Sequence, residues 1–424
     1  MWHRMVRRTS NWSKSLQCRL FSPLSRRYAV EYEGDWSYSS EWWKDHDSDS
    51  GKTVFKSHSD VGNGDVSVVA YPSSRPCLEE WETTEKWLQD KYTKAHPEFK
   101  DNGGKFSILG YQWRVLRFND STRQSTVKVM AAYKNYDSQP GSVYLMQQPH
   151  CLAVPYLKSM ISIGLSTLAS SCYNLLSAVR GDRPLHVLCI GHGGGSIPLF
   201  MSTNIPGAIV HSVEIDPVVL SASIGAMGFP SLALGRNREN EEDNDVLWEN
   251  IDGRLLIFNS DAEEFVQVSK TMYDLVFVDA YDGDDIFSRK LWDPNSPFLK
   301  SLGSRVHPEH GTVAINLHGD SDFLSANYVN YQKSGSLPIG KYVSNVSRAY
   351  KEEFGSAFAL SVPWLCNVTV VACRGFVDGQ STSSSNKKDS IMNTLITGSE
   401  FVENAMDMPF SCTEYIYRDF VVFD

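Results

Sequence analysis

The sequence predicts an α/β protein with a doubly wound, mostly parallel sheet of seven strands and a small N-terminal β-rich extension. Short apolar segments alternate with helical stretches from Leu185 onwards, which is the rhythm of βαβ units. The first segment, residues 185–190, is an apolar run of the kind found in central parallel strands. A glycine-rich stretch follows it directly and opens a helix, as a nucleotide-binding turn does.

The elements of the predicted α/β domain, residues 151–377, follow from the same patterns. Further strands are expected at residues 209–215, 255–259, 274–280 and 311–317, with a helix at 342–354 and a closing antiparallel hairpin at 357–362 and 366–373. A long apolar helix at 152–176, broken near Gly164, precedes the first strand. An acidic insertion at 236–253 and a Ser-rich polar loop at 378–389 are expected to be solvated, and the domain is followed by this loop and a C-terminal tail, residues 378–424.

The segment before this domain, residues 31–150, has a weaker pattern. Residues 31–75 have little periodicity and are expected to form an irregular, partly disordered wrapping segment. A helix is expected at 78–95, with two strands at 111–118 and 126–133 that are joined by a polar turn at 119–122.

The first thirty residues have the composition of an organelle transit peptide. They contain seven basic residues, six Ser or Thr and no acidic residue, and they lack the apolar core of a secretory signal. Import into the mitochondrion is expected, with the chloroplast as the alternative and a disordered basic arm as the simpler interpretation. Because this segment carries +7 of a total of −10, the remaining chain carries −17.

The composition excludes several classes of protein. The acidic balance disfavours a nucleic-acid partner, and no run approaches the roughly 18 apolar residues of a membrane-spanning helix. Eight cysteines without a C-x-x-C pair indicate neither a disulfide framework nor a zinc ribbon, so no metal site is predicted. A basic protein partner is easier to accommodate, and the oligomeric state is not determined by the sequence.

The glycine-rich turn predicts a nucleoside-binding site. Its residues Gly191, His192, Gly193 and Gly195 allow a tight turn and a close approach of backbone to ligand. Glu214 ends the next strand, 23 residues after Gly191, where an acidic side chain accepts hydrogen bonds from ribose hydroxyls. The alternative for each acid in such a position is that it only ends a strand or caps a helix.

Four more residues complete the predicted cofactor contacts. They are Asp261, placed to accept from an adenine amino group, its neighbour Ala262, Ile215 next to Glu214, and Asp279 at the end of a later strand. An NAD fingerprint would have glycine at the place of Ser196, and a phosphate-binding P-loop would need Gly-Lys-Ser/Thr. S-adenosylmethionine fits better, because the positive helix N-terminus can receive its carboxylate while Glu214 receives its ribose. His192 is expected to act as a backbone spacer near that carboxylate.

These motifs resemble a known family. The runs at 187–200, 213–217 and 273–282 resemble those of spermidine-synthase-like class I methyltransferases, closest to the C-terminal domain of the methyltransferase-like protein thirteen family. The resemblance covers roughly residues 105–375. It implies a Rossmann-like fold, S-adenosylmethionine as cofactor and a protein substrate, because members of that family methylate the elongation factor that delivers aminoacyl-tRNA.

The strand end at residues 279–282 is the predicted catalytic segment. Asp282 is expected to orient an acceptor amine or accept its proton, Asp279 to be partly structural, and Tyr281 to line the acceptor channel. An acidic turn that only caps the next helix is the alternative. The family pattern has Ser and Lys in this loop, so the acceptor need not be the family's.

The resemblance extends to polyamine synthases, from which this chain departs. Their glycine motif has Asp at the place of Gly194. If Tyr156 matches their helix tyrosine, the acids on either side of that tyrosine are replaced by Leu152, Ala153 and Lys158, although Asp279 and Asp282 match acids that those enzymes keep. A polycationic substrate would then be buried without partners. The sequence thus predicts a methyltransferase of a protein amine in an organelle. The alternatives are an aminopropyltransferase and a silent S-adenosylmethionine-binding scaffold factor.

Overall fold

The computed structural model describes residues 51–73, 78–95, 105–120, 122–136, 139–234, 245–284, 286–319, 340–362, 367–375, 384–417 and 420–423. The predicted leader at 1–30, the segment 31–50, residues 236–244 of the acidic insertion and the start of the polar loop lie outside the described residues.

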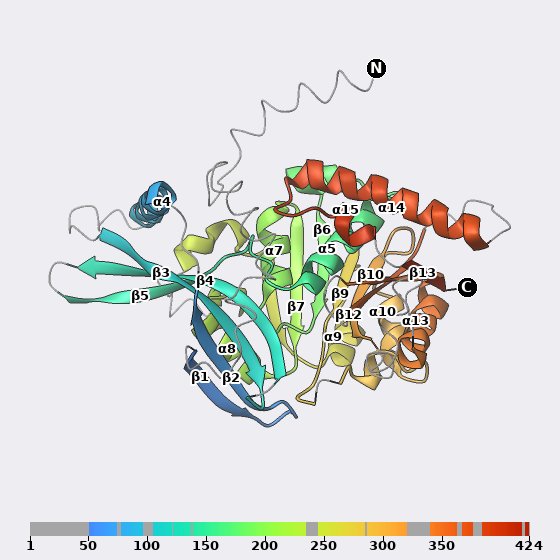
Figure 1. Cartoon of the computed structure of the whole chain (residues 1–424), viewed down its shortest axis with the longest axis horizontal. Helices are drawn as coiled ribbons and strands as arrows, with labels where there is room; N and C mark the ends of the chain where they lie inside the picture. Colours follow the sequence, from blue (N-terminus) through green and yellow to red (C-terminus); the bar gives the residue numbers. More distant parts are fainter. Residues whose placement is uncertain are drawn as a thin grey trace, which may run out of the picture.

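The central sheet has the predicted doubly wound order, with one strand more than expected (Figure 1). Its order is β13-β11-β12-β10-β9-β6-β7-β8. The parallel strands are β6 (Leu185–Ile190), β7 (Ala208–Glu214), β8 (Leu255–Asn259), β9 (Leu275–Val278) and β10 (Thr312–His318). The predicted closing hairpin is confirmed as β11 (Ser356–Ser361) and β12 (Asn367–Cys373), which pair antiparallel.

Two hydrophobic cores lie on the two faces of this sheet. Val187 and Cys189 of β6 belong to one core and Leu188 and Ile190 to the other, as alternation along a strand requires. Helices α5 (Pro155–Ala169), α6 (Leu175–Arg180) and α7 (Ser196–Asn204) pack into the first core. Helices α9 (Ala262–Val268), α10 (Pro297–Gly303) and α13 (Lys341–Phe354) pack into the second.

The segment assigned to a polar loop and C-terminal tail forms helices and a strand from residue 384 onwards, which the sequence analysis did not predict. Helix α14 (Ser384–Met406) runs along α5, and the short α15 (Thr413–Ile416) and the edge strand β13 (Phe420–Phe423) follow it (Figure 1). The buried residues Ile391, Leu395, Val402 and Met406 recur at helical spacing, so α14 buries one apolar stripe against the domain. Because the start of this segment is rich in Ser, its composition does not indicate the apolar stripe that follows.

The predicted helix at 152–176 is divided, but not at Gly164. Helix α5 ends at Ala169, and α6 begins at Leu175 after a turn. Gly164 lies within α5, where an added Cβ would come within 3.3 Å of the side chains of Leu275 and Phe277. This glycine therefore allows close packing of the helix on the sheet and does not break the helix.

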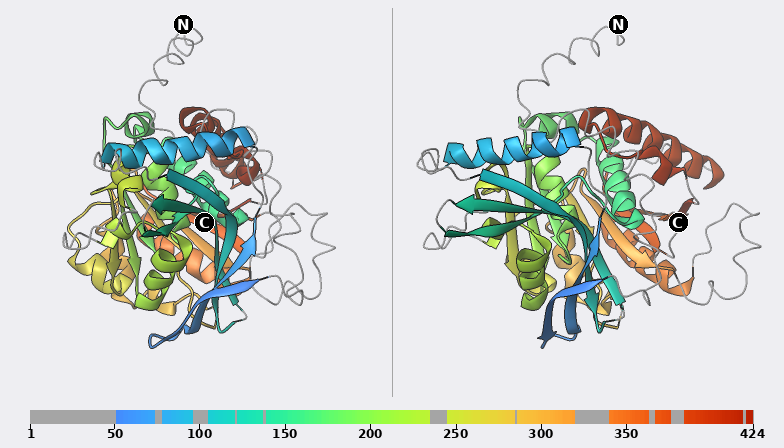
Figure 2. Two further views of the ribbon diagram at one scale, coloured as in Figure 1. Left: turned by 90° about the vertical axis from the view of Figure 1, so that its left-hand side faces the viewer. Right: turned by 60° about the vertical axis from the view of Figure 1, so that its left-hand side comes forward.

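The N-terminal extension forms a separate five-stranded antiparallel sheet beside the carboxyl ends of the central strands (Figures 1 and 2). Its strands are β1 (Lys52–Ser59), β2 (Gly64–Pro72), β3 (Lys105–Phe118), β4 (Thr122–Tyr136) and β5 (Gln139–Gln147), and α4 (Leu78–Ala95) matches its predicted bounds. The turn before β4 has positive φ at Asn119 and Asp120, which suits a tight hairpin.

The irregular segment predicted at 31–75 is wrong for residues 52–72, which form the β1–β2 hairpin. Val66 and Val68 alternate along β2 and pack against Val219 and Met227 of α8 (Pro217–Met227). The described part of the acidic insertion is likewise not a solvated loop. Its Leu247, Trp248 and Ile251 are buried in the first core, because apolar residues are interspersed among the acids.

Among the described helices, none combines the length and the apolar character needed to cross a bilayer.

Candidate active site

A cavity of about 320 Å³ lies at the carboxyl ends of the parallel strands, where ligands bind in open α/β sheets. The turns of the N-terminal sheet close its other side. The cavity is lined by all but one of the predicted site residues: Gly191, His192, Gly193, Glu214, Ile215, Asp261, Ala262, Asp279, Tyr281 and Asp282. The strand ends therefore bring the predicted residues together.

The glycine turn after β6 is sterically required. Gly191 has φ +85°, and an added Cβ would collide with the backbone carbonyl oxygen of Asp279. Helix α7 begins after the turn without a side-chain cap, and its Ser196 and Ile197 line the cavity. The amide groups at this helix end are thus suited to bind a carboxylate.

Gly195 is the predicted site residue that does not line the cavity. It occupies the N-cap position of α7 with φ +77°, and a Cβ there would collide with the ring of Phe229. Its observed role is to form the turn and to allow this packing. A direct contact with a cofactor stays a prediction.

Glu214 is buried beside the glycine turn, with 8% of its surface exposed. Oε2 accepts from the His192 amide at 2.9 Å, and Oε1 accepts from the Asp216 amide at 3.0 Å. Burial raises the pKa of Glu214, and the amides of Asp216, His192 and Gly193 counteract the rise. Each carboxylate oxygen has a second lone pair, so the side chain can also accept from a ligand hydroxyl.

The His192 ring faces the protein interior, as expected for a backbone spacer. Its nitrogens lie 3.0 Å from the Ser212 hydroxyl and 2.9 Å from that of Ser223, and Phe229 packs edge-on against the ring. Burial lowers the pKa of His192 to about 3, so the ring is neutral at pH 7. His192 therefore contributes its backbone, and not an acid or base, to the site.

Asp261 caps a helix and also lines the cavity. Oδ1 accepts from the Glu263 amide at 2.8 Å, and Oδ2 accepts from Lys290 Nζ at 3.1 Å. Burial alone would raise the pKa of Asp261, but the hydrogen bonds from Lys290, Glu263 and Glu264 hold it below its usual value. The capping alternative is thus observed, while the contact with adenine stays a prediction.

Asp279 is held by a chain of two side-chain amides. Its Oδ1 accepts from Asn316 Nδ2 at 2.9 Å, and Asn316 Oδ1 accepts from Asn367 Nδ2 at 2.9 Å. Tyr281 is also fixed, because its hydroxyl donates to the Asn316 carbonyl at 3.0 Å and accepts from the His318 amide at 3.0 Å. The Tyr281 ring stacks on the His318 ring with centroids 4.5 Å apart. The arrangement agrees with a structural Asp279 and a lining Tyr281.

Asp282 is exposed at the mouth of the cavity. Its Oδ1 accepts from the amides of Asp284 at 3.0 Å and Ile286 at 2.9 Å, so it stabilises its own acidic turn. It does not cap the next helix, η6 (Arg289–Leu291), whose N-cap residue is Ser288. The side chain still lines the cavity, so its role towards an acceptor stays a prediction.

Several cavity residues were missed by the sequence analysis. They are Asn63, Arg123, Ser125, Lys290, Asn316 and His318. His318 ends β10 beside β9, so the rule that placed Asp279 at a strand end also applies to it. Residues of the N-terminal sheet reach the site only through tertiary packing and carry no local signal.

The sheet order, the glycine turn and the acid that ends β7 together define the Rossmann-like fold that class I methyltransferases share with spermidine synthases. No protein-family model matches the chain. A protein of Bos taurus described as "eEF1A lysine and N-terminal methyltransferase" is 44% identical over 144 residues, covering 32% of this chain and 18% of that protein. This similarity confirms the resemblance found in the motifs.

The chain is also similar to a polyamine synthase, the second group that its motifs resemble. The polyamine aminopropyltransferase of Chromobacterium violaceum is 28% identical over 102 residues, covering 24% of this chain and 32% of that protein. The solved structure of human methyltransferase-like protein 13 in complex with SAH aligns over 57% of this chain and 92% of that chain, at 19% identity and a TM-score of 0.35. Because the match with the bovine protein covers 18% of that protein, the chain spans about a fifth of the length of this relative.

Proposed function

We propose that this protein is an S-adenosylmethionine-dependent methyltransferase that methylates an amine of a protein substrate. The observation that carries the proposal is the buried Glu214 carboxylate, which lies in the cavity between the glycine turn and the end of β7. S-adenosylmethionine supplies an electrophilic methyl group on a sulfonium when it is bound.

The residues present fit this cofactor. Glu214 accepts hydrogen bonds from ribose hydroxyls, and the uncapped start of α7 receives the methionine carboxylate. Asp261 and Ala262 line the same cavity and would bind the adenine. A buried acceptor for hydroxyl groups beside the amides of a helix start without a side-chain cap suits a nucleoside that carries a carboxylate.

The acceptor end of the cavity is lined by carboxylates. Freeing a lysine amine with a pKa near 10.4 costs about 4.6 kcal/mol at pH 7. Asp282 orients the acceptor amine and takes its proton, while Asp279, fixed by Asn316, shapes the channel. Exclusion of water supplies the remaining assistance, since a nearby carboxylate also favours the charged amine.

Aminopropyl transfer is the competing activity, and Gly194 argues against it. A Cβ on Gly194 would lie 2.9 Å from Met227, 3.0 Å from Val127 and 3.2 Å from Ser125. The N-terminal sheet and α8 thus fill the place where the polyamine synthases carry an aspartate. The presence of an aminopropyltransferase among the relatives makes putrescine the appropriate competing substrate in an assay.

A protein acceptor is supported by the bovine relative, whose description names a lysine and an N-terminal amine of eEF1A. The loop at 279–285 differs from that family's pattern, so we propose the amine class and leave the acceptor protein to the assay. We further propose that the protein acts in the mitochondrion, with the chloroplast as alternative, because residues 1–30 are basic and free of acids.

The test uses the full-length protein, methyl-labelled S-adenosylmethionine, and either organelle extract or purified eEF1A. We expect a labelled protein band that Glu214→Ala abolishes and the exposed control Glu249→Ala retains. Cofactor binding without any labelled product would favour the scaffold factor. Transfer from decarboxylated S-adenosylmethionine to putrescine would favour the aminopropyltransferase, and absence of cofactor binding would refute the proposal.

A further inference from the structure

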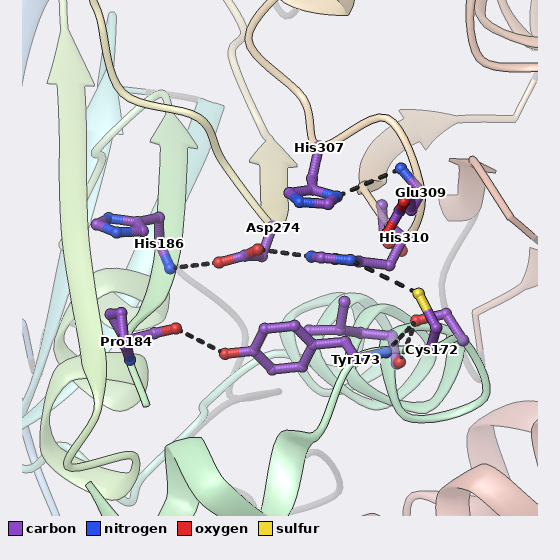
Figure 3. A network of polar contacts seen from close by, with 11 residues as sticks. Cys172, Tyr173, Pro184, His186, Asp274, His307, Glu309 and His310 are labelled. Atoms are coloured by element: carbon purple, nitrogen blue, oxygen red, sulfur yellow. Dashed lines mark hydrogen bonds and ion pairs between the residues drawn. The ribbon is translucent and has the colours of Figure 1, made fainter. Parts of the chain in front are cut away.

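Figure 3 shows a cluster of polar side chains. It lies at the amino ends of the central parallel strands, whereas the cavity lies at their carboxyl ends. It forms where β6, β9 and β10 begin and where the chain leaves α5. Because β6 has six residues at about 3.3 Å each, the cluster is roughly 20 Å from the glycine turn. It is independent of the proposed methyl transfer.

His310 is fixed in one orientation by Asp274. The His310 ring is 2% exposed, and its Nε2 lies 2.7 Å from Asp274 Oδ1. The other oxygen of Asp274 accepts from the His186 amide at 2.8 Å. Since a carboxylate accepts and does not donate, Nε2 carries the proton, and the lone pair of His310 is on Nδ1. That nitrogen faces the sulfur of Cys172 at 3.9 Å (Figure 3).

Aromatic rings and a backbone contact hold this arrangement rigid. The His307 ring stacks on His310 with centroids 3.6 Å apart, and the Tyr173 ring packs against His310 at 5.0 Å. The Tyr173 hydroxyl donates to the Pro184 carbonyl at 2.8 Å. His307 Nδ1 accepts from the Glu309 amide at 3.3 Å, which fixes the turn that carries Glu309.

We propose that Cys172, Glu309 and His310 form a zinc-binding site, with water as the fourth ligand and Asp274 orienting His310. One ligand atom from each of the three side chains lies within 4.8 Å of the other two. Zinc–sulfur and zinc–nitrogen bonds of about 2.3 and 2.05 Å place the two ligand atoms about 3.5 Å apart in a tetrahedron, so the observed separation needs only a small closure. A carboxylate on the far nitrogen of a ligating histidine is the usual support of such a ligand.

The same residues also resemble a nucleophile, a base and its orienting acid, and Glu309 distinguishes the two interpretations. A carboxylate beside Cys172 repels an unpaired thiolate, whereas a divalent cation is attracted by both anions. Sulfur, nitrogen and oxygen ligands together suit zinc better than calcium or magnesium, which prefer oxygen alone. The metal would join the end of α5 to the turn before β10.

The test uses the full-length protein without a histidine tag, stripped with a chelator and then titrated with Zn²⁺. We expect one zinc per chain and a Tm that rises by about 4 °C at a hundredfold excess over Kd. Replacing Zn²⁺ with Co²⁺ should give thiolate-to-cobalt charge-transfer absorption in the near ultraviolet.

Two variants and a control test the assignment of the ligands. Cys172→Ser should abolish the cobalt band, and Glu309→Gln should weaken zinc binding by at least tenfold. Both side chains are exposed, so neither variant is expected to unfold the protein, and the exposed Glu352→Gln serves as the control. Zinc binding that is unchanged in Cys172→Ser would overturn the proposal. Absence of zinc binding, with rapid alkylation of Cys172, would instead support the nucleophile.

Discussion

The hydroxyl of Ser125 accepts a hydrogen bond from the backbone amide of Gly194 at 3.0 Å, although 69 positions separate them in the chain. This contact joins β4 of the N-terminal sheet to the glycine turn of the domain built on the central sheet. Val127 of the same strand lies close to Gly194 as well. The N-terminal sheet is thus part of the site and not a separate appendage.

Ser125→Ala is therefore expected to weaken S-adenosylmethionine binding about fivefold. Loss of one hydrogen bond costs about 1 kcal/mol, and here it also loosens the turn that carries Gly193 and Gly194. Isothermal titration calorimetry measures the change, with the exposed Ser107→Ala of β3 as a control on the same sheet. An unchanged Kd for Ser125→Ala would show that the turn is rigid without this contact.

Gly191→Ala is expected to remove cofactor binding and lower Tm by several degrees. The added methyl group would collide with the Asp279 carbonyl oxygen, and φ of +85° is unfavourable for alanine. The matched control is Gly225→Ala on the exposed side of α8, where an added Cβ meets no atom within 4 Å. That variant should gain about 0.5–1 kcal/mol from helix propensity. Thermal unfolding of both variants checks the contrast, and equal destabilisation would contradict it.

The parallel strands and the glycine turn were predictable because each depends on local sequence. Leu185–Ile190 and Leu255–Asn259 match their predicted bounds, since buried parallel strands read as continuous apolar runs. The residues that only tertiary packing brings to the site were not predictable. Asn316 and Ser125 contact Asp279 and Gly194 from strands distant in sequence, and no local pattern identifies such partners.

Polar composition was a second reason why elements of the fold were not predicted from the sequence. Asp and Ser concealed the β1–β2 hairpin and helix α14, although Val66 and Val68 alternate in the first and apolar residues recur at helical spacing in the second. In both elements the buried face is narrow. The average polarity of the segment is therefore set by the residues that face solvent and does not reveal the buried face. The role of Asp282 could not be predicted from the sequence for a similar reason, because one acidic residue can stabilise a turn and line a cavity at once.

Leu395→Ala tests whether α14 belongs to the catalytic domain. Its side chain is fully buried, so we expect a loss of about 2–5 kcal/mol in the free energy of unfolding. Asn393→Ala, exposed on the same helix, should change stability by less than about 0.5 kcal/mol. Urea unfolding measures both. A single transition shifted as a whole in Leu395→Ala is expected, whereas an unshifted transition would place α14 outside the cooperative unit.

The buried His192 ring is expected to make the stability of the protein depend on pH. Its pKa of about 3 in the folded protein lies below the value near 6.5 of an unfolded chain, so the unfolded state binds a proton first as pH falls. Stability is therefore full above pH 6.5 and declines towards pH 3. Between pH 7.5 and pH 5 the contribution of this ring is a loss of about 2 kcal/mol. His192→Gln keeps a polar side chain between Ser212 and Ser223 without a titrating group, and it should reduce the pH dependence by that amount. Urea unfolding at the two pH values measures the difference, and equal pH dependence in the two proteins would show that the ring is not held neutral.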